Sequence, residues 1–169
     1  PDELREQMRE GLAGFVRGTV TRGSPLATND LAVRKVAALE ALSREGPLRS
    51  DLFGSFSVTP NQWPTGAVID WYLAMKRNPQ LAGSAAWMLE AERVLRARLH
   101  LQGATLGFST EQQDGWWWLM MSADTNANRL LLAMMDNPKW QADMGRMARG
   151  ALGRQHKGRW STTVANAWG

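Results

Sequence analysis

The sequence contains no cysteine, which excludes disulfide bonds, thiolate metal sites and a cysteine nucleophile for this chain. The absence does not decide the compartment, because cysteine-free proteins occur in both reducing and oxidising places. No apolar run approaches the roughly 18 residues of a membrane-spanning helix. The first residues, beginning Pro1-Asp2-Glu3, are not those of a signal peptide. We therefore expect no direct membrane insertion of this chain.

Charge of one sign is not concentrated in any long run. The chain has 20 Lys and Arg against 16 Asp and Glu, with a formal net charge of +4. Interleaved charges of this kind are typical of solvated helix faces, so we expect no nucleic-acid partner. The most basic stretch follows a predicted helix C terminus, where cations interact favourably with the helix dipole. We interpret it as structural, with an acidic partner as the alternative. Its members are Arg146, Arg149, Arg154, His156, Lys157 and Arg159.

Apolar residues are plentiful by contrast. They make up 44% of the 169 residues, which is enough for one domain with a sizeable core. Nine Trp against one Tyr and four Phe is unusual. Because a buried indole N–H needs a partner, many of these rings should lie where two layers meet.

Apolar spacing of three and four residues predicts a chain of helices. The first carries glycines at 11, 14 and 18, so either another helix packs closely there or the helix is shorter than its pattern. Residues 50–64 are expected to form a loop with Phe53 and Phe56 as apolar anchors. The predicted helices are residues 2–21, 29–44, 65–77, 80–97, 123–136 and 139–152, and a last one that begins near Ser161.

Between Leu99 and Ser109 the pattern changes to alternating apolar and polar residues around Gly103. This alternation predicts a small β-hairpin inserted near 98–109.

The stretch Asp114–Met135 joins three consecutive tryptophans, Trp116–Trp118, to a helix capped by Ser122 or Asp124. We interpret the tryptophans as core and layer-boundary packing rather than as a sugar or base platform. The apolar stripe expected on this helix is Ala127, Leu130, Leu131, Met134 and Met135.

Two sequence patterns recur. Thr125-Asn126-Ala127-Asn128 returns as Thr163-Val164-Ala165-Asn166, and Leu73-Ala74-Met75 with Asn78-Pro79 returns as Leu132-Ala133-Met134 with Asn137-Pro138. A repeat of roughly 35–40 residues with two helices each indicates stacked α-hairpins, either a solenoid or a closed α/α toroid. We expect Thr125, Asn128, Thr163 and Asn166 to cap and cross-link successive hairpins.

No motif for catalysis stands out. His100 and His156 lie at no metal-ligand spacing, and we expect both at the surface. A triad of Ser109, His100 and Asp114 lacks a nucleophile-elbow motif. Glu90 and Glu92 are two residues apart on a helix and do not face one another. We therefore predict no catalytic, cofactor-binding or metal-binding residues, no cofactor and no enzymatic activity.

Four stretches nevertheless resemble bacterial alpha-2-macroglobulins, which are large multidomain proteins of the cell envelope. The similarity is continuous from about Leu99 to the end of the chain. Over the residues before Leu99 it is limited to the general pattern. The stretches are residues 101–109, 117–120, 126–132 and 158–169, which begin Leu101-Gln102-Gly103, Trp117-Trp118-Leu119, Asn126-Ala127-Asn128 and Gly158-Arg159-Trp160.

The resemblance implies a fragment, 1–169, of the helical α/α-toroid domain related to the thioester domain of complement proteins. It implies a periplasmic protein, anchored to the inner membrane through an N-terminal lipoprotein segment, that inhibits endopeptidases in bacterial defence. Cleavage of a bait region elsewhere then releases the toroid domain, and the partners are proteases and other domains of the same chain. Thioester members carry a Cys-x-Glu-Gln motif, which this cysteine-free chain lacks, so no functional residue is carried over.

Two alternatives stay open. A toroid-fold enzyme, such as a glycosidase or cyclase, would need paired carboxylates or metal ligands at the toroid axis. A helical-repeat scaffold would show an exposed aromatic and basic concave surface. A fragment of a toroid should expose apolar surface where the next hairpin belongs, and we expect this at Ser161–Gly169, with self-association as the consequence.

Overall fold

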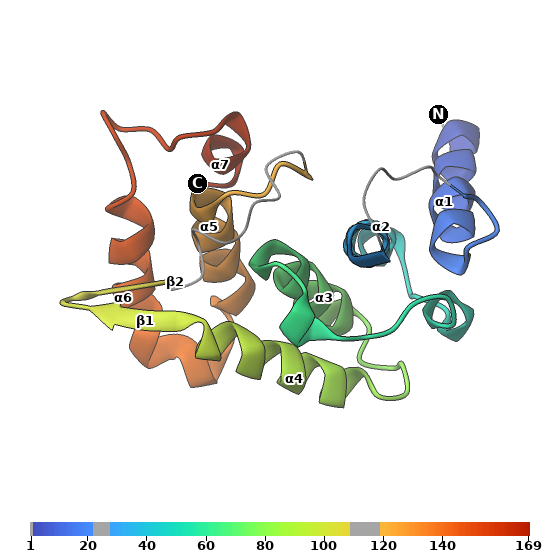
Figure 1. The fold of residues 1–169 in the computed structure, drawn as a ribbon, viewed down its shortest axis with the longest axis horizontal. Helices are drawn as coiled ribbons and strands as arrows, with labels where there is room; N and C mark the ends of the chain where they lie inside the picture. Colours follow the sequence, from blue (N-terminus) through green and yellow to red (C-terminus); the bar gives the residue numbers. More distant parts are fainter. Residues whose placement is uncertain (1, 22–27, 109–118) are drawn as a thin grey trace. The chain divides into compact units, whose positions relative to one another are not determined.

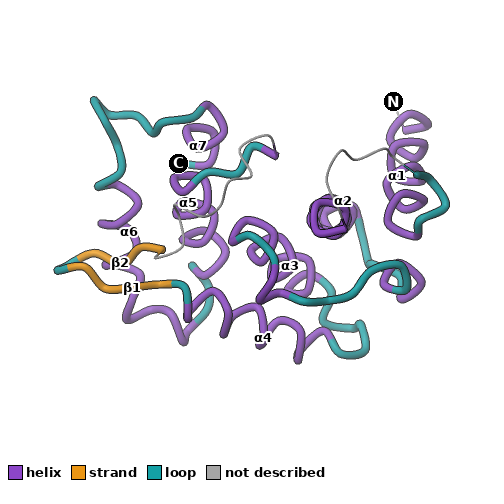
Figure 2. Tube along the Cα trace, in the orientation of Figure 1, coloured by secondary structure: helices purple, strands orange, loops and turns teal. Residues whose placement is uncertain are grey.

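The computed structural model describes residues 2–21, 28–108 and 119–169, and within them the chain is mostly helical (Figure 2). These residues form two compact units. Unit 1 comprises Pro1–Trp63 with Asp70–Glu92, and unit 2 comprises Pro64–Ile69 with Arg93–Gly169. No helix in the described ranges is long and apolar enough to cross a membrane.

The elements follow one another along the chain as coloured in Figure 1. Unit 1 contains α1 (Asp2–Arg17), α2 (Thr28–Glu45) and the short 3-10 helices η1 (Ser50–Phe53) and η2 (Pro60–Gln62). Helices α3 (Thr65–Arg77) and α4 (Ser84–Ala97) contribute residues to both units. Unit 2 contains β1 (Leu99–Gln102), β2 (Thr105–Phe108), α5 (Ala123–Met134), η5 (Pro138–Trp140), α6 (Gln141–Leu152) and α7 (Thr163–Trp168).

The predicted class, helical with a small β-hairpin, is confirmed. Strands β1 and β2 pair antiparallel, with Leu99 opposite Phe108 and Gln102 opposite Thr105. Gly103 closes the turn at a φ of 58°, a left-handed conformation that glycine adopts without steric cost. The bounds of α3 match the predicted range 65–77, because Asn78-Pro79 ends the helix as the restriction before proline predicts.

Several helices are shorter than their patterns. The range 80–97 becomes α4 only from Ser84, because residues 78–83 form turns and Gly83 has a φ of +86°. The range 139–152 begins with the 3-10 turn η5, and the last helix begins at Thr163 rather than near Ser161. Residues 50–64 are not irregular throughout, since η1 and η2 lie within them.

Helix α1 ends at Arg17 instead of residue 21. Gly18 takes a φ of +84°, and the N–H groups of Thr19 and Val20 both donate to the carbonyl of Gly14, 3.0 and 3.1 Å away. This is the glycine-terminated helix end in which the chain reverses over the last turn. Val20 then occupies the space beside Gly14, so the glycine serves the helix end rather than a close helix pair.

Unit 1 is built around the ring of Trp71, which is fully buried. Phe53, Phe56, Trp63 and Trp87 surround it with ring centroids 5.5–6.5 Å from its own. Aromatic pairs at such separations each contribute about 0.5–1.5 kcal/mol beyond area burial. The predicted anchoring role of Phe53 and Phe56 is confirmed.

A buried carboxylate joins α2 to α3 within unit 1. Glu40 is 5% exposed and accepts from Arg77 Nη1 at 2.7 Å and from Arg44 Nε at 2.9 Å. Arg77 Nη1 also donates to Ser43 Oγ at 3.1 Å. Burial of a carboxylate is tolerated only when such partners are in place.

In unit 2 the hairpin packs against α6 (Figure 1). The closest approach is at Gly150, where a Cβ atom would collide with the backbone carbonyl of Leu106. Arg149 Nε donates to the carbonyl of Ala104 at 2.9 Å and reinforces the same contact. The absence of a side chain at position 150 therefore sets the distance between helix and hairpin.

Trp140 lies at the start of α6 and is fully buried. The guanidinium carbon of Arg96 lies 3.9 Å from its ring centroid, and Arg96 also donates to Asp143 Oδ2 at 3.0 Å and to the carbonyl of Lys139 at 3.1 Å. A cation over an indole face in this way ties α4 to α6.

Substituting Gly150→Ala should destabilise unit 2, because the new methyl group must push the hairpin away from α6. We expect a loss of about 1–3 kcal/mol in the free energy of unfolding, as for other overpacked sites. Thermal or urea unfolding followed by circular dichroism measures it.

The matched control is Gly145→Ala on the same helix. A Cβ there meets only Arg149 Nη1, at an ordinary 3.6 Å. This variant should be neutral or more stable, because alanine favours helix over glycine by up to about 1 kcal/mol. Equal stability of the two variants would contradict the account of Gly150.

Candidate functional site

The first turn of α5 holds a cluster of hydrogen-bonded polar residues in unit 2. Ser122 is the N-cap, and its hydroxyl accepts from the N–H of Thr125 at 3.2 Å. Asp124, the alternative cap, is instead a buried partner for the segment before α7. Its Oδ2 accepts from Ser161 Oγ at 2.5 Å and from Ser161 N–H at 3.0 Å, and its Oδ1 accepts from Arg154 Nε at 2.7 Å.

The partners of Asp124 decide its charge. Burial raises the pKa of this carboxyl, but the two hydrogen bonds from Ser161 and the nearby guanidinium of Arg154 outweigh burial, so the pKa is lowered overall. The carboxylate is therefore held ionised and fully engaged. A group in this state is suited to fixing structure and not to accepting a proton from a substrate.

Asn128 supplies the link from α5 to α7. Its Nδ2 donates to the carbonyl of Ala165 at 3.0 Å, and both residues are buried. The cap of α7 is Thr162, whose hydroxyl accepts from the N–H of Ala165 at 3.1 Å. Asn128 therefore links two helices as predicted, while the assignment of these helices to successive hairpins of a toroid stays a prediction. Ser122 caps α5, as one of the two predicted caps, and the caps are not Thr125 and Thr163.

The two recurring Thr-x-Ala-Asn sequences therefore occupy different helical positions. Asn166 does not reach another helix: its Nδ2 donates to the carbonyls of Trp160 and Thr162, at 2.9 and 2.6 Å. The two sequences do not begin equivalent helices, because α7 begins at Thr163 itself while α5 begins two residues before Thr125.

The buried face of α5 also differs from the predicted apolar stripe. Leu130 and Met134 are buried as expected, but Met135 lies past the end of the helix and is 51% exposed. Four polar residues near the start of the helix are also buried: Asp124, Thr125, Asn126 and Asn128. Residues 109–118, which include Ser109, Asp114 and Trp116–Trp118, lie outside the described part of the chain.

The basic stretch at 146–159 divides into two parts. Arg146 pairs with Asp143, and Arg149 and Arg154 make the contacts described above. Beyond them, His156 and Arg159 exchange both backbone hydrogen bonds, at 2.8 and 3.3 Å, across a tight turn. The first part is structural, as predicted, and the turn exposes its basic side chains.

His100 and His156 are both exposed, as expected. Among the described residues, no group of three or more His, Asp or Glu side chains is placed to hold a metal ion.

One buried amine was missed by sequence reasoning. Lys35 is 4% exposed and its Nζ donates to Ser55 Oγ at 2.7 Å, while burial lowers the pKa of the amine. A serine beside such a lysine resembles a base-activated nucleophile. However, the Ser55 hydroxyl donates its own proton to the carbonyl of Val16, so the pair connects α1, α2 and the loop after η1.

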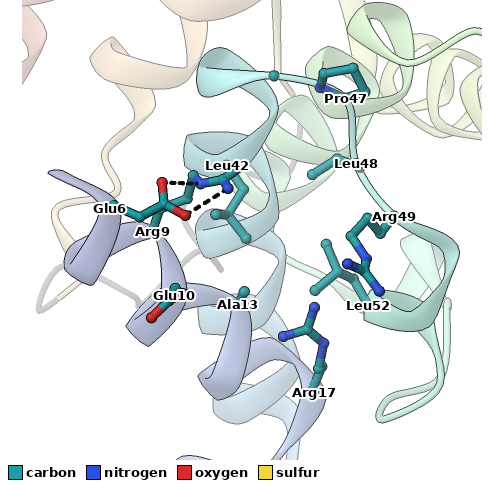
Figure 3. A pocket seen from close by; sticks show the side chains of 11 residues that line it. Glu6, Arg9, Glu10, Ala13, Arg17, Leu42, Pro47, Leu48, Arg49 and Leu52 are labelled. Carbon is teal, nitrogen blue, oxygen red and sulfur yellow. Dashed lines mark hydrogen bonds and ion pairs between the residues drawn. The ribbon is translucent and has the colours of Figure 1, made fainter. Parts of the chain in front are cut away.

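A cavity in unit 1 lies between α1, α2 and η1, and we call it the α1 pocket (Figure 3). Its volume is ≈ 270 Å³, just below the usual range of ligand sites. Leu42, Leu48 and Leu52 provide apolar walls, with Leu42 near the middle of the view and Leu52 beside Arg17 and Arg49 (Figure 3). The other residues that line it are Glu6, Arg9, Glu10, Ala13, Arg17, Gly46, Pro47 and Arg49.

Charges of opposite sign occupy the two ends of the α1 pocket. At one end Arg9 donates to both carboxylate oxygens of Glu6, at 2.8 and 2.9 Å, and this hydrogen bond lowers the pKa of Glu6. At the other end Arg17 and Arg49 share Asp51, with Nε–Oδ distances of 2.7 and 3.1 Å. Burial raises the pKa of Asp51, but Arg17 and then Arg49 outweigh it and the pKa is lowered.

Comparison of the chain with models of known protein families, with curated proteins and with solved structures finds no match.

Asp124→Asn should lower the free energy of unfolding of unit 2 at neutral pH by about 1–3 kcal/mol. The amide nitrogen of the new side chain would face the donor groups of Ser161 or Arg154 and could not accept from them. The folded-state pKa of Asp124 is lowered, so its stabilisation is present above the unfolded aspartate pKa of about 3.9 and is lost as the pH falls through the folded value. The difference in melting temperature between the two proteins should therefore shrink in acid. A difference that is constant from pH 7 to pH 2.5 would contradict this.

Asn128→Ala should lower the melting temperature, because it leaves the buried carbonyl of Ala165 without this donor. We expect about 1–3 kcal/mol, or several degrees for a chain of this size. The exposed Gln102→Ala on β1 is the control and should melt like the wild type. An unchanged melt of Asn128→Ala would refute the cross-link.

Proposed function

We propose that this chain is a helical part of a bacterial alpha-2-macroglobulin, a broad-spectrum endopeptidase inhibitor that traps proteases after bait-region cleavage. The chain would form one partial α/α-toroid domain of antiparallel helical hairpins, related to the thioester domain. It works in the periplasm, in a protein anchored to the inner membrane through an N-terminal lipoprotein segment. It has no enzymatic activity of its own, and its partners are proteases and other domains of the same protein.

The α5–α7 junction is the observation that carries this proposal. Asn128, Ser161 and Thr162 belong to the sequence stretches that resemble the macroglobulins, and each makes a contact that positions α7. The resemblance therefore rests on residues that specify helix packing. Residues that specify helix packing, and not a chemical reaction, are what we expect in a domain that helps to enclose a protease.

A recurring helix end supports the repeat architecture. After α3, Asn78 N–H donates to the carbonyl of Met75, and its own carbonyl accepts from Leu81 N–H. After α5, Asn137 makes the same two bonds, with the carbonyl of Met134 and the N–H of Trp140. The two Asn-Pro sequences thus end their helices with one turn geometry, as repeated α-hairpins would.

Exposed apolar side chains support contacts with other domains. Leu4 and Met8 on α1 are 57% and 62% exposed and line a second, more apolar groove of ≈ 620 Å³ against α2. The sequence predicted exposed apolar surface at Ser161–Gly169, and this location was wrong. Val164 and Trp168 are half-buried there, and Arg129 lies over the Trp168 ring. We assign the α1 face to packing against another domain of the full-length protein.

The test uses the full-length protein that contains this chain. It is incubated with a trypsin-like protease, and hydrolysis of a large protein substrate and of a small chromogenic peptide are both measured. A trap should suppress the first and spare the second, because an enclosed protease keeps a working active site that only small substrates reach. Unimpaired hydrolysis of the large substrate after bait cleavage would refute the proposal.

Two variants test whether trapping depends on the part of the protein formed by this chain. Asn128→Ala loosens the α5–α7 junction and should reduce trapping without changing the rate of bait cleavage. Lys157→Gln changes an exposed charge on the turn after α6 and should trap like the wild type. A toroid enzyme or a peptide-binding scaffold, the two alternatives, would leave both substrates equally hydrolysed.

A further inference from the structure

The α1 pocket carries more charge than its own ion pairs neutralise. At its acidic end, Glu6 and Glu10 face one cation, Arg9, which is bound to Glu6. Glu10 makes no hydrogen bond or ion pair within the described residues. This end therefore has an excess of one negative charge.

The basic end of the pocket has an excess of charge of the opposite sign. Arg17 and Arg49 both bind the one carboxylate of Asp51, so an excess of one positive charge remains there. Figure 3 shows the guanidinium groups of Arg17 and Arg49 beside Leu52, away from Glu6 and Glu10. Along α1, Ala13 lies between Glu10 and Arg17 (Figure 3).

The separation of the ends sets the length of a complementary ligand. Glu10 and Arg17 are seven residues apart on α1, which corresponds to a rise of about 10 Å along a helix. An extended peptide advances about 3.3–3.6 Å per residue, so three residues span this length. Its amino and carboxyl termini would then meet charges of opposite sign.

We propose that the α1 pocket binds a short zwitterionic peptide, about three residues long, with an apolar central side chain. The terminal ammonium group faces Glu10, the terminal carboxylate faces Arg49 and Arg17, and the central side chain lies against Leu42 and Leu52. Charge-assisted hydrogen bonds at both ends give the orientation. This inference does not depend on the macroglobulin proposal.

The test measures binding of Ala-Leu-Ala to the whole chain by calorimetry or by NMR titration. Four forms of the peptide are compared: free, N-acetylated, C-amidated and blocked at both ends. Each block removes one charge and should weaken binding about fivefold to tenfold, since the pocket is open to solvent. Equal affinity for all four forms would overturn the proposal, as would the absence of any binding of the free peptide.

Two substitutions remove the uncompensated charges and keep the fold. Arg49→Gln leaves the Arg17–Asp51 pair in place, and Glu10→Gln leaves the Glu6–Arg9 pair in place. Arg49→Gln should weaken binding of the free and N-acetylated peptides and leave the C-amidated form unchanged. Glu10→Gln should weaken binding of the free and C-amidated peptides and leave the N-acetylated form unchanged.

The matched controls change the same charges outside the pocket, with Lys76→Gln for Arg49 and Glu90→Gln for Glu10. Both should bind all four peptides like the wild type. A control that weakens binding as much as its pocket partner would assign the effect to net charge and overturn the site. Thermal melts of all variants show whether a loss of binding reflects unfolding.

Discussion

In each unit a buried carboxylate joins separate elements by accepting from several donors at once. In unit 1, Glu40 accepts from Arg44 and Arg77 and so joins α2 to α3. In unit 2, Asp124 accepts from Arg154 and Ser161 and so positions the segment before α7. Taking a carboxylate out of water costs several kcal/mol unless its partners are present. The donors offset this desolvation cost only when the elements that carry them are in place. Each carboxylate therefore favours the observed arrangement of these elements over alternative ones.

Local features of this fold were predictable because local physics determines them. The end of α3 at Asn78-Pro79 follows from the restriction on residues before proline, and the hairpin from alternation around Gly103. Helix limits were less predictable where a turn competes with helical periodicity. The apolar pattern of α1 continues to Val20, yet Gly18 reverses the chain earlier.

The features on which the two proposals rest could not be predicted in the same way, because they join residues far apart in sequence. Periodicity along α5 identifies Leu130 and Met134 as core, but it cannot show that Asp124 meets Arg154 and Ser161. The α1 pocket was missed for a related reason. Charges on α1 fit the pattern of a solvated helix face, and only their placement opposite η1 reveals an excess of each sign at the two ends.

The turn after α6 affects how readily a protease can cut the chain there. Lys157 and Gly158 take φ angles of 54° and 76°, the conformation of a tight two-residue turn, closed by the paired backbone bonds of His156 and Arg159. Exposed loop tips are the usual sites of nicking, and basic residues are what trypsin-like enzymes cleave after. A protease must first straighten its substrate, and here that means breaking both bonds. The geometry that displays Lys157 and Arg159 to solvent thus also hinders cutting beside them.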